Sequence, residues 1–349
     1  MPPEKQRVGL GLLGTGRVGR LHLNSLCRLR DKCQVIHVAD PFIERHREWL
    51  EELGIHKLSS NYKDVIADPE VKAVYICTTT DTHGPLLKEA AREGKDIFCE
   101  KPIDMTLEGA EEALQVARSA GVLLQVGFNR RFDPSFANVR ERYRSGEIGT
   151  VDIMRITSRD PEPPPSIDWI KSSGGLFHDM TAHDFDMCRY VAGSEIEAVC
   201  AAGAVRVDEA IGQAGDIDTC VVTLWLENGA LCSIDNSREA VYGYDMRMEV
   251  FGRKGMLRAL NETPTRVESV KSEGTLTDKP HYWFRERFPE SMLRQAESFL
   301  DAVMTRSAPL VSGADALTAL RVALAADISM REKRVVRVDE IKLSREAAS

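Results

Sequence analysis

The amino-acid sequence predicts an α/β fold in two domains. Strand and helix patterns alternate up to residue 127, which indicates a doubly wound parallel sheet with helices on both faces. From residue 152 onward strand patterns predominate and hairpin turn signals separate several of them, which indicates an α+β domain with an open, mostly antiparallel sheet. We therefore expect one domain at 1–127 and a second at 128–349.

The composition is that of an ordinary soluble protein that acts on a small molecule. The chain has 349 residues, of which 43% are hydrophobic and 29% are charged, with a net charge of −8. A nucleic acid or an anionic membrane would require a basic face, so we expect neither as a partner. No apolar run is long enough to span a membrane, and the eight scattered cysteines include no Cys-x-x-Cys pair. We expect a cytoplasmic protein with reduced thiols.

The first element is an apolar strand over Arg7–Leu13, directly followed by a glycine-rich turn and a helical pattern. The turn has the form G-x-G-x-x-G and consists of Gly14, Thr15, Gly16, Arg17, Val18 and Gly19. The first glycine permits the turn, the second lets the backbone approach a pyrophosphate, and the third permits close packing of the helix. This is the fingerprint of a Rossmann domain that binds a dinucleotide on its first helix N-terminus.

A second strand over Gln34–Ala39 ends in Asp40, about twenty residues after the last glycine, as the dinucleotide fingerprint requires. We expect Asp40 to accept hydrogen bonds from the adenosine ribose. Its charge would repel a 2′-phosphate, which favours NAD over NADP, whereas Arg45 in the following helix is a residue that could accommodate that phosphate. The alternative is that Asp40 is only a turn residue at the end of a strand.

The next strands also end in polar loops. A buried strand over Ala73–Cys77 leads into a loop before a helix, and Asp96–Cys99 leads into Glu100-Lys101-Pro102. Ligands bind at the carboxyl ends of parallel strands, so these loops supply further candidate cofactor residues, namely Thr78, Thr79, His83, Glu100 and Lys101. A structural ion pair is the alternative for Lys101. A helix over 107–120 and a strand over 122–127 complete this domain.

The second domain begins with a loop from Phe128 and a helix from Pro134 to Tyr143. Six strands are predicted, over 152–158, 196–204, 217–226, 230–236, 247–251 and 256–260. Pro161–Pro165 cannot lie inside a strand and is predicted to form a rigid loop near the site. Two helices, over 289–305 and 313–333, should cover the sheet. Because Ile217–Leu226 is apolar on both faces, we expect one face to form a homo-oligomer interface, in a tetramer.

A single segment of this domain concentrates acidic and histidine side chains in apolar surroundings. It opens with Gly174-Gly175, continues as a helical pattern, and Gly193 is placed where the helix would stop. Asp179 and His183 are four residues apart, so they share one helical face. A carboxylate beside an imidazole is the arrangement of a general base. The alternatives are a solvated helix face and a metal site that would add His178.

Taken together, these motifs identify the chain as a member of the glucose-fructose oxidoreductase and inositol dehydrogenase (Gfo/Idh/MocA) family over nearly its whole length. The family resemblance rests on the glycine-rich turn, the loop Thr78–His83, Glu100-Lys101-Pro102 and the segment that begins at Gly174. Three further segments resemble its inositol 2-dehydrogenase branch, namely Phe128–Pro134, Asp179–Asp186 and Tyr242–Asp245. The resemblance implies Lys101, Asp179 and His183 as the catalytic trio, NAD as the cofactor, and no metal. It also implies a second group of side chains around a polyol, namely Asn129, Arg130, Asp160 and Tyr242.

The predicted reaction is oxidation of a secondary alcohol of myo- or scyllo-inositol, or of a related sugar, to the ketone. His183 would take the hydroxyl proton, Asp179 would orient the His183 imidazole, and Lys101 would stabilise the developing alkoxide. Two other activities remain open, an NAD-dependent glycosidase and a sugar 1-dehydrogenase. A non-catalytic regulator of the same fold would have no use for this proton-transfer set. Asn129 replaces the apolar residue associated with that position in inositol dehydrogenases, which leaves the stereoisomer open.

Overall fold

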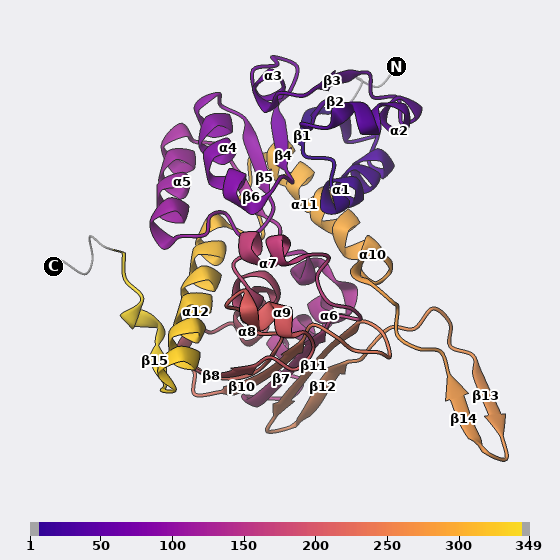
Figure 1. Cartoon of the computed structure of the whole chain (residues 1–349), viewed down its shortest axis with the longest axis vertical. Helices are drawn as coiled ribbons and strands as arrows, with labels where there is room; N and C mark the ends of the chain where they lie inside the picture. Colours follow the sequence, from indigo (N-terminus) through magenta and orange to yellow (C-terminus); the bar gives the residue numbers. More distant parts are fainter. Residues whose placement is uncertain (1–6, 344–349) are drawn as a thin grey trace. The chain divides into compact units, whose positions relative to one another are not determined.

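The computed structural model describes residues 7–343, which form two compact units (Figure 1). The first unit consists of the chain up to Phe132 together with Pro289–Thr318. The second unit consists of Asp133–Phe288 together with the chain from Ala319 onward. Each unit has its own sheet and its own hydrophobic core. No helix within residues 7–343 is both long and apolar enough to cross a membrane.

The first unit contains a six-stranded parallel sheet with the order β3-β2-β1-β4-β5-β6. Its strands are β1 (Val8–Leu13), β2 (Cys33–Ala39), β3 (Lys57–Ser59), β4 (Ala73–Ile76), β5 (Asp96–Cys99) and β6 (Leu124–Val126). The order reverses between β1 and β4, so the predicted doubly wound sheet is confirmed. In such a sheet the loops after β1 and β4 flank the point where a ligand binds.

Helices lie on both faces of this sheet, as a doubly wound fold requires. They are α1 (Arg17–Arg28), α2 (Arg47–Glu52), α3 (Tyr62–Ile66), α4 (Thr80–Arg92), α5 (Leu107–Ala120) and α11 (Pro289–Thr305), with the short 3₁₀ turns η1 (Ile43–His46) and η2 (Asn129–Phe132). Helices α4 and α5 lie side by side on one face and α1 and α11 on the other (Figure 1).

Helix α11 belongs to the first unit although it lies far along the chain, in the part that the sequence analysis assigned to the second domain. Its Phe299 meets the rings of Tyr75 and Phe98 edge-on, at centroid distances of 5.5 and 5.9 Å. These two rings stack on each other at 4.6 Å on strands β4 and β5. The apolar face of α11 therefore packs on a surface that the parallel sheet offers, and this pairing of distant segments has no signal in local periodicity.

The second unit contains a seven-stranded sheet with the order β12-β11-β7-β10-β9-β8-β15. Its strands are β7 (Val151–Arg159), β8 (Ile196–Ala204), β9 (Thr219–Leu226), β10 (Leu231–Ser237), β11 (Asp245–Gly252), β12 (Gly255–Ala259) and β15 (Val336–Arg337). The pair β7 and β10 is parallel and the other neighbours in this sheet are antiparallel. The predicted open, mostly antiparallel sheet is therefore confirmed.

The helices of this unit gather on one face of the sheet (Figure 1). They are α6 (Pro134–Arg144), α7 (Ile167–Ser173), α8 (Ala182–Ala192), α9 (Glu209–Gln213), α10 (Phe284–Arg287) and α12 (Gly313–Glu332, in this unit from Ala319), with the turns η3 (Phe177–Thr181) and η4 (Val338–Glu340). Phe136, Phe185 and Val322 carry the apolar faces of α6, α8 and α12 into one core with the sheet.

Several elements of the second unit have no counterpart in the sequence analysis, among them helix α7 and a hairpin. Helix α7 follows the proline-rich stretch directly, and the Ser166 side chain starts it by accepting a hydrogen bond from the Trp169 N–H. A hairpin of β13 (Glu268–Lys271) and β14 (Gly274–Thr277) lies in a segment for which no structure was predicted. Both of its strands are exposed on every residue, so the alternation of buried and exposed side chains that reveals a strand is missing.

Candidate functional site

The glycine-rich turn between β1 and α1 has the geometry of a phosphate cradle. Gly14 has φ +92°, and its N–H donates to the carbonyl of Ala39 at 2.8 Å. A Cβ on Gly14 would lie 2.6 Å from the Cys77 carbonyl oxygen, and a Cβ on Gly19 would lie 2.1 Å from the Gly14 carbonyl oxygen. Both positions therefore exclude any larger side chain, as the sequence motif predicts.

Gly16 differs from these two because a Cβ placed there would meet no protein atom within 4 Å. It is the N-cap of α1, and Arg17 and Val18 begin that helix, so backbone N–H groups of its first turn lack intrahelical partners. Open space in front of a helix N-terminus suits an anionic group. The turn thus fits the pyrophosphate of a dinucleotide, with Gly16 leaving the room that the phosphate needs.

Asp40 lies immediately beside this turn. One carboxylate oxygen accepts hydrogen bonds from the Thr15 N–H at 2.8 Å and the Thr15 hydroxyl at 2.9 Å, and the other accepts from the Phe42 N–H at 2.8 Å. Thr15 is fully buried and Asp40 nearly so. The carboxylate is therefore held in a fixed orientation at the end of β2, with acceptor capacity left for a further donor.

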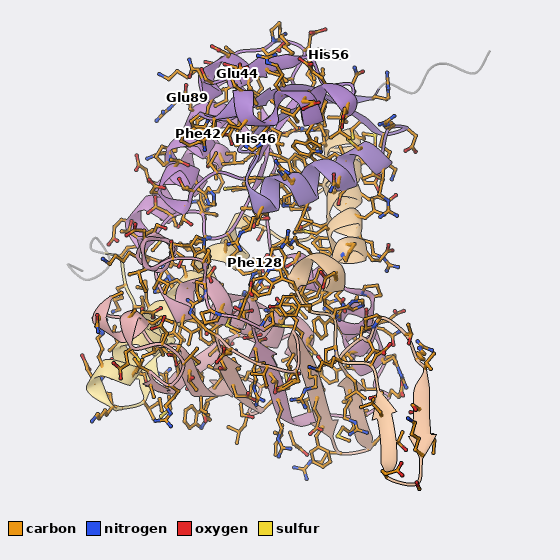
Figure 2. All side chains as sticks on the ribbon, turned by 45° about the vertical axis from the view of Figure 1, so that its right-hand side comes forward. Phe42, Glu44, His46, His56, Glu89 and Phe128 are labelled. Atoms are coloured by element: carbon orange, nitrogen blue, oxygen red, sulfur yellow. The ribbon has the colours of Figure 1, made fainter. Side chains whose placement is uncertain are left out.

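Beyond Asp40, the side chain of Phe42 is 59% exposed, and the guanidinium of Arg45 lies over its ring at 4.7 Å. Phe42, Glu44 and His46 come to the surface on the same side of the first unit (Figure 2). Nδ1 of His46 accepts a hydrogen bond at 2.9 Å from Nη2 of Arg20, a residue of helix α1. Arg45 is thus held by a cation–π contact with the Phe42 ring rather than by an ion pair with the Asp40 carboxylate.

Thr78, Thr79 and His83 lie where β4 gives way to α4. His83 is buried, with Nδ1 2.8 Å from the Pro102 carbonyl oxygen and Nε2 3.1 Å from the Thr78 carbonyl oxygen. Burial lowers the pKa of His83, against the opposite effect of these two carbonyl groups. The imidazole therefore connects the loop after β4 with the loop after β5, and this is the role the structure gives it.

The loop after β5 carries Glu100 and Lys101, as predicted. Glu100 Oε1 is 2.6 Å from Nε2 of His22, a fully buried residue of α1 whose ring meets Phe98 edge-on at 4.7 Å. The Lys101 N–H also donates to the other Glu100 oxygen at 3.3 Å. The loop that bears Lys101 is thereby tied to the helix that begins at the glycine-rich turn. The sequence analysis did not identify His22 as the partner of Glu100, although its position on the first helix, one turn after Gly19, could be read from the sequence.

In the second unit, the segment that begins at Gly174 forms the predicted helical run, but its first turn is a π turn rather than an α-helical one. Gly174 and Gly175 have φ near +84°, and they are followed by the π-helical turn η3 and then by α8. Asp179 lies in the π turn and His183 in the first turn of α8. Gly193 ends α8 with φ +61°, as predicted. Single π turns within helices are frequent at functional sites.

Asp179 has a partner that the sequence analysis did not anticipate. Its Oδ2 lies 3.5 Å from Nη1 of Arg238, whose Nη2 lies 3.6 Å from a second carboxylate, that of Asp216. Arg238 is completely buried, with 0% of its surface exposed to solvent. No spacing rule connects Asp179, Asp216 and Arg238, because they come from separate elements, so the sequence offered no signal for this cluster.

His178, the third member of the alternative metal set, points to a different partner. Its Nε2 lies 2.7 Å from Oδ2 of Asp327 on helix α12. Among residues 7–343, no group of three or more His, Cys, Asp or Glu side chains is arranged to hold a metal ion. His178 thus joins the π turn to α12 in this structure.

The four predicted polyol residues belong to different units. Asn129 and Arg130 lie in η2 of the first unit, where the Asn129 carbonyl accepts a hydrogen bond from the Ser291 hydroxyl. Asp160 follows β7 in the second unit, and its N–H donates to the Ser237 carbonyl at 2.9 Å. Lys101 belongs to the first unit, whereas Asp179 and His183 belong to the second.

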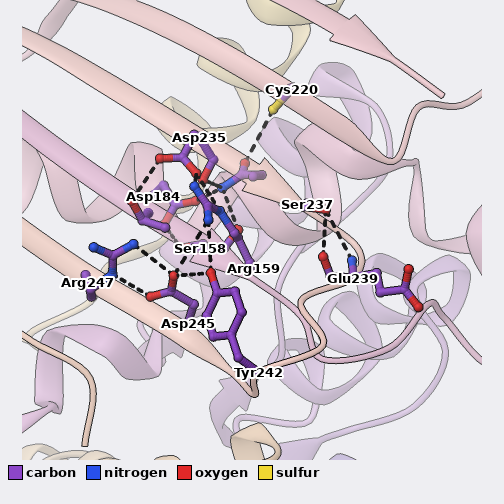
Figure 3. Close-up of polar contacts among 12 residues, drawn as sticks. Ser158, Arg159, Asp184, Cys220, Asp235, Ser237, Glu239, Tyr242, Asp245 and Arg247 are labelled. Atoms are coloured by element: carbon purple, nitrogen blue, oxygen red, sulfur yellow. Dashed lines mark hydrogen bonds and ion pairs between the residues drawn. The ribbon is translucent and has the colours of Figure 1, made fainter. Parts of the chain in front are cut away.

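Tyr242 lies in a polar network on the sheet of the second unit (Figure 3). Its hydroxyl donates to Asp245 at 2.6 Å and accepts from Arg159 at 2.9 Å, and Arg159 in turn pairs with Asp235 at 2.6 Å. Burial and the hydrogen bond to Asp245 raise the pKa of Tyr242. The ring also lines a pocket of about 350 Å³ together with Ser237 and other residues of β9 and β10. The hydroxyl is therefore engaged by protein groups in this structure.

Comparison with known proteins gives matches over nearly the whole chain. A family profile described as "Oxidoreductase family, NAD-binding Rossmann fold" matches residues 8–128, and one described as "GFO/IDH/MocA C-terminal domain" matches residues 136–258. Myo-inositol 2-dehydrogenase of Thermotoga maritima is 44% identical over 95% of this chain and 99% of its own length. Inositol 2-dehydrogenase of Rhizobium meliloti is 43% identical over 95% of this chain and 99% of its own length.

A solved structure shares the fold of both units. The crystal structure of scyllo-inositol dehydrogenase from Lactobacillus casei, with bound NAD(H) and scyllo-inositol, has a TM-score of 0.87 and 28% identity. The match covers 96% of this chain and 100% of that one.

Proposed function

The chain belongs to the Gfo/Idh/MocA family of NAD-binding oxidoreductases, and on this premise we propose that it is an NAD-dependent cyclitol dehydrogenase. It oxidises a secondary alcohol of an inositol, or of a related sugar, to the ketone. The observation that carries the proposal is the pairing of two features in one chain. These are a dinucleotide cradle completed by Asp40, and the acid–imidazole segment of Asp179 and His183. The relatives named as inositol dehydrogenases support the substrate class.

Each member of the predicted catalytic trio has a role in this reaction. His183 removes the hydroxyl proton, Asp179 orients the imidazole and binds a neighbouring hydroxyl, and Lys101 stabilises the negative charge that develops on the oxygen. NAD, when bound, supplies the acceptor for the hydride that leaves the carbon. The protein residues supply position and charge, which convert a slow bimolecular reaction into an oriented one.

The remaining contacts with the dinucleotide and the polyol are proposed from where each residue lies in the fold. The residues from Gly14 to Gly19, with Asp40, hold the dinucleotide, and the loops after β4 and β5 contribute Thr78, Thr79, His83 and Glu100. Around the polyol we propose Asn129, Arg130, Asp160 and Tyr242. Residues 1–127 would thus form the cofactor domain, and residues 128–349 the domain for substrate and oligomerisation.

We also propose that the protein is a homotetramer that assembles through the open face of the seven-stranded sheet. Neighbouring strands bring Met256, Phe251, Ile153, Leu231 and Trp225 into one row across this face. The first four of these side chains are between 39% and 45% exposed. A contiguous apolar row of this kind is costly in water and is removed when a second copy covers it.

A cytoplasmic location completes the proposal. All eight cysteines lie within residues 7–343 and are free thiols, which is typical of a reducing compartment. The net charge of −8 fits a small polar substrate and no nucleic-acid partner.

The test of the function is a screen for NADH formation. The purified protein and NAD are incubated with myo-inositol, scyllo-inositol and glucose, and NADH absorbance is followed. We expect steady, net NADH production with at least one inositol. A glycosidase of this family would instead release sugar from a glycoside without net NADH, and that result would replace the proposed activity.

A further inference from the structure

Arg238 is a buried arginine that the reaction described above does not use. It follows the last residue of β10, and its backbone N–H donates to the Asp218 carbonyl at 2.8 Å. The guanidinium has no solvent exposure and lies 5.7 Å from the centre of the Trp169 ring. Its position is therefore fixed both by the strand from which it comes and by the packing around it.

The guanidinium is surrounded by acceptors but is poorly satisfied. It lies between Asp179 and Asp216 at 3.5 and 3.6 Å, beyond the 2.7–2.9 Å typical of a close charged pair. Within residues 7–343, Nε and Nη2 have no hydrogen-bond partner. Burying a charge with unsatisfied donors is expensive, and such an arrangement is weak support for stability. The loose geometry instead suits a residue that shares its charge between two carboxylates.

The second carboxylate holds the other end of the same segment. Asp216 Oδ1 accepts a hydrogen bond from the Leu176 N–H at 3.1 Å, directly before the π turn. A Cβ on Gly175 would lie 2.6 Å from that same oxygen, so the backbone approaches Asp216 as closely as a glycine allows. Asp216 thus fixes the start of the segment, and Arg238 connects Asp216 to Asp179 within it.

We propose that Arg238 is a positioning residue for the catalytic carboxylate: it holds Asp179 in the orientation in which that side chain acts on His183 and on the substrate. This inference rests on the proposed function, because it assigns Arg238 a role through Asp179. Without the guanidinium, two carboxylates would face each other with no cation between them, and Asp179 would turn away from its working position. Misplacement by about 1 Å can lower a rate by about a hundred-fold.

The test is a double-mutant cycle on kcat/KM for the inositol that serves as substrate. Arg238→Met in the wild-type background should lower kcat/KM by about a hundred-fold and leave the KM for NAD unchanged. In the Asp179→Asn background the same change should cost less than about three-fold, because the interaction is already removed. A purely structural role predicts the same factor in both backgrounds, and equal factors would overturn the proposal.

Arg287→Met serves as the matched control. Arg287 is also a buried arginine of the second unit, and its Nη1 pairs with Asp133 at 2.6 Å. Its loss should lower the melting temperature, and any effect on kcat/KM should be the same factor with Asp179 or Asn at position 179. The cycle therefore separates coupling to Asp179 from general destabilisation.

Two further variants keep the test decisive if Arg238→Met does not fold. Arg238→Lys retains the charge and should recover most of the lost kcat/KM, and Arg238→Met with Asp216→Asn removes one charge of each sign. For Arg238→Met with Asp216→Asn, a cost that is unchanged by Asp179→Asn would contradict the inference. A folded Arg238→Lys protein that has lost most of its kcat/KM would contradict it as well. If the wild-type protein forms no NADH from any inositol, the proposed function fails and the inference with it. If the wild-type protein is active and the effects of Arg238→Met and Asp179→Asn on kcat/KM simply add, the proposed function stands and only the inference about Arg238 fails.

Discussion

At the scale of single residues, we propose that the carboxylate of Asp40 makes the protein prefer NAD to NADP. Three hydrogen bonds from Thr15 and Phe42 hold it at the end of β2, so it cannot easily move away from a 2′-phosphate. We predict that kcat/KM is higher with NAD than with NADP, and that Asp40→Ser reduces this preference by on the order of ten-fold. Asp40→Asn is the control that keeps the shape of the side chain and removes the charge. Equal kcat/KM values for the two cofactors in the wild type would refute this prediction.

His183 carries the proton transfer in this account. His183→Ala should lower kcat by about a hundred- to ten-thousand-fold. The affinity for NAD should stay unchanged, since the glycine-rich turn and Asp40 belong to the other unit. Lys101→Ala should also be severe and should raise the KM for the polyol, because an ammonium can bind the ground state as well as the transition state. Steady-state kinetics and NAD titration check both variants, and a fully active His183→Ala protein would rule out its role as the base.

The charge of Asp179 should be visible in the pH dependence. A carboxylate near an imidazole favours the protonated ring, which is inactive as a base, so replacing it by an amide lets the ring stay unprotonated to lower pH. The acid limb of kcat/KM should therefore move to lower pH in Asp179→Asn, with activity between those of wild type and His183→Ala. An unchanged acid limb in an active variant would mean that Asp179 binds substrate without affecting His183.

At the scale of elements, two glycines of the glycine-rich turn have different roles: Gly19 is needed for packing, and Gly16 leaves room for the ligand. Gly19→Ala places a Cβ 2.1 Å from the Gly14 carbonyl oxygen, so it should lower the melting temperature and NAD affinity together. Gly16→Ala meets no protein atom within 4 Å, so it should keep the wild-type melting temperature and weaken NAD binding alone. Thermal unfolding and NAD titration of both variants test this contrast, and a stability loss in Gly16→Ala would contradict it.

The elements that sequence patterns could predict are those with a local signal. The parallel strands other than β3, the helices α5 and α11, and the hairpin strands of the second sheet were predicted because apolar periodicity and turn residues lie within each of them. The π turn was missed, because the apolar side chains Leu176, Phe177 and Met180 fit an α-helical turn as well as a π turn. The acid–imidazole pair was found by spacing, whereas Arg238 and Asp216 approach Asp179 only through the folded sheet.

At the scale of the whole molecule, we propose that the open face of the second sheet forms the interface between copies of the chain. Phe251→Glu introduces a charge into the apolar row formed with Ile153 and Met256. We predict that it lowers the light-scattering mass at micromolar concentration from that of a tetramer to that of a dimer or monomer. Val270→Glu is the control, since Val270 is an exposed apolar residue of the hairpin β13–β14 outside this row. A wild-type protein that is strictly monomeric would contradict the proposal.

The central claim is that a hydrogen leaves a carbon of the cyclitol for NAD while His183 takes the hydroxyl proton. The most direct measurement uses an inositol deuterated at every ring carbon, with wild type and His183→Ala. The account predicts a ketone product, NADH that carries one deuterium, a slower rate with the deuterated substrate, and almost no product from the variant. NADH without deuterium, or no NADH from any inositol although NAD binds, would contradict it.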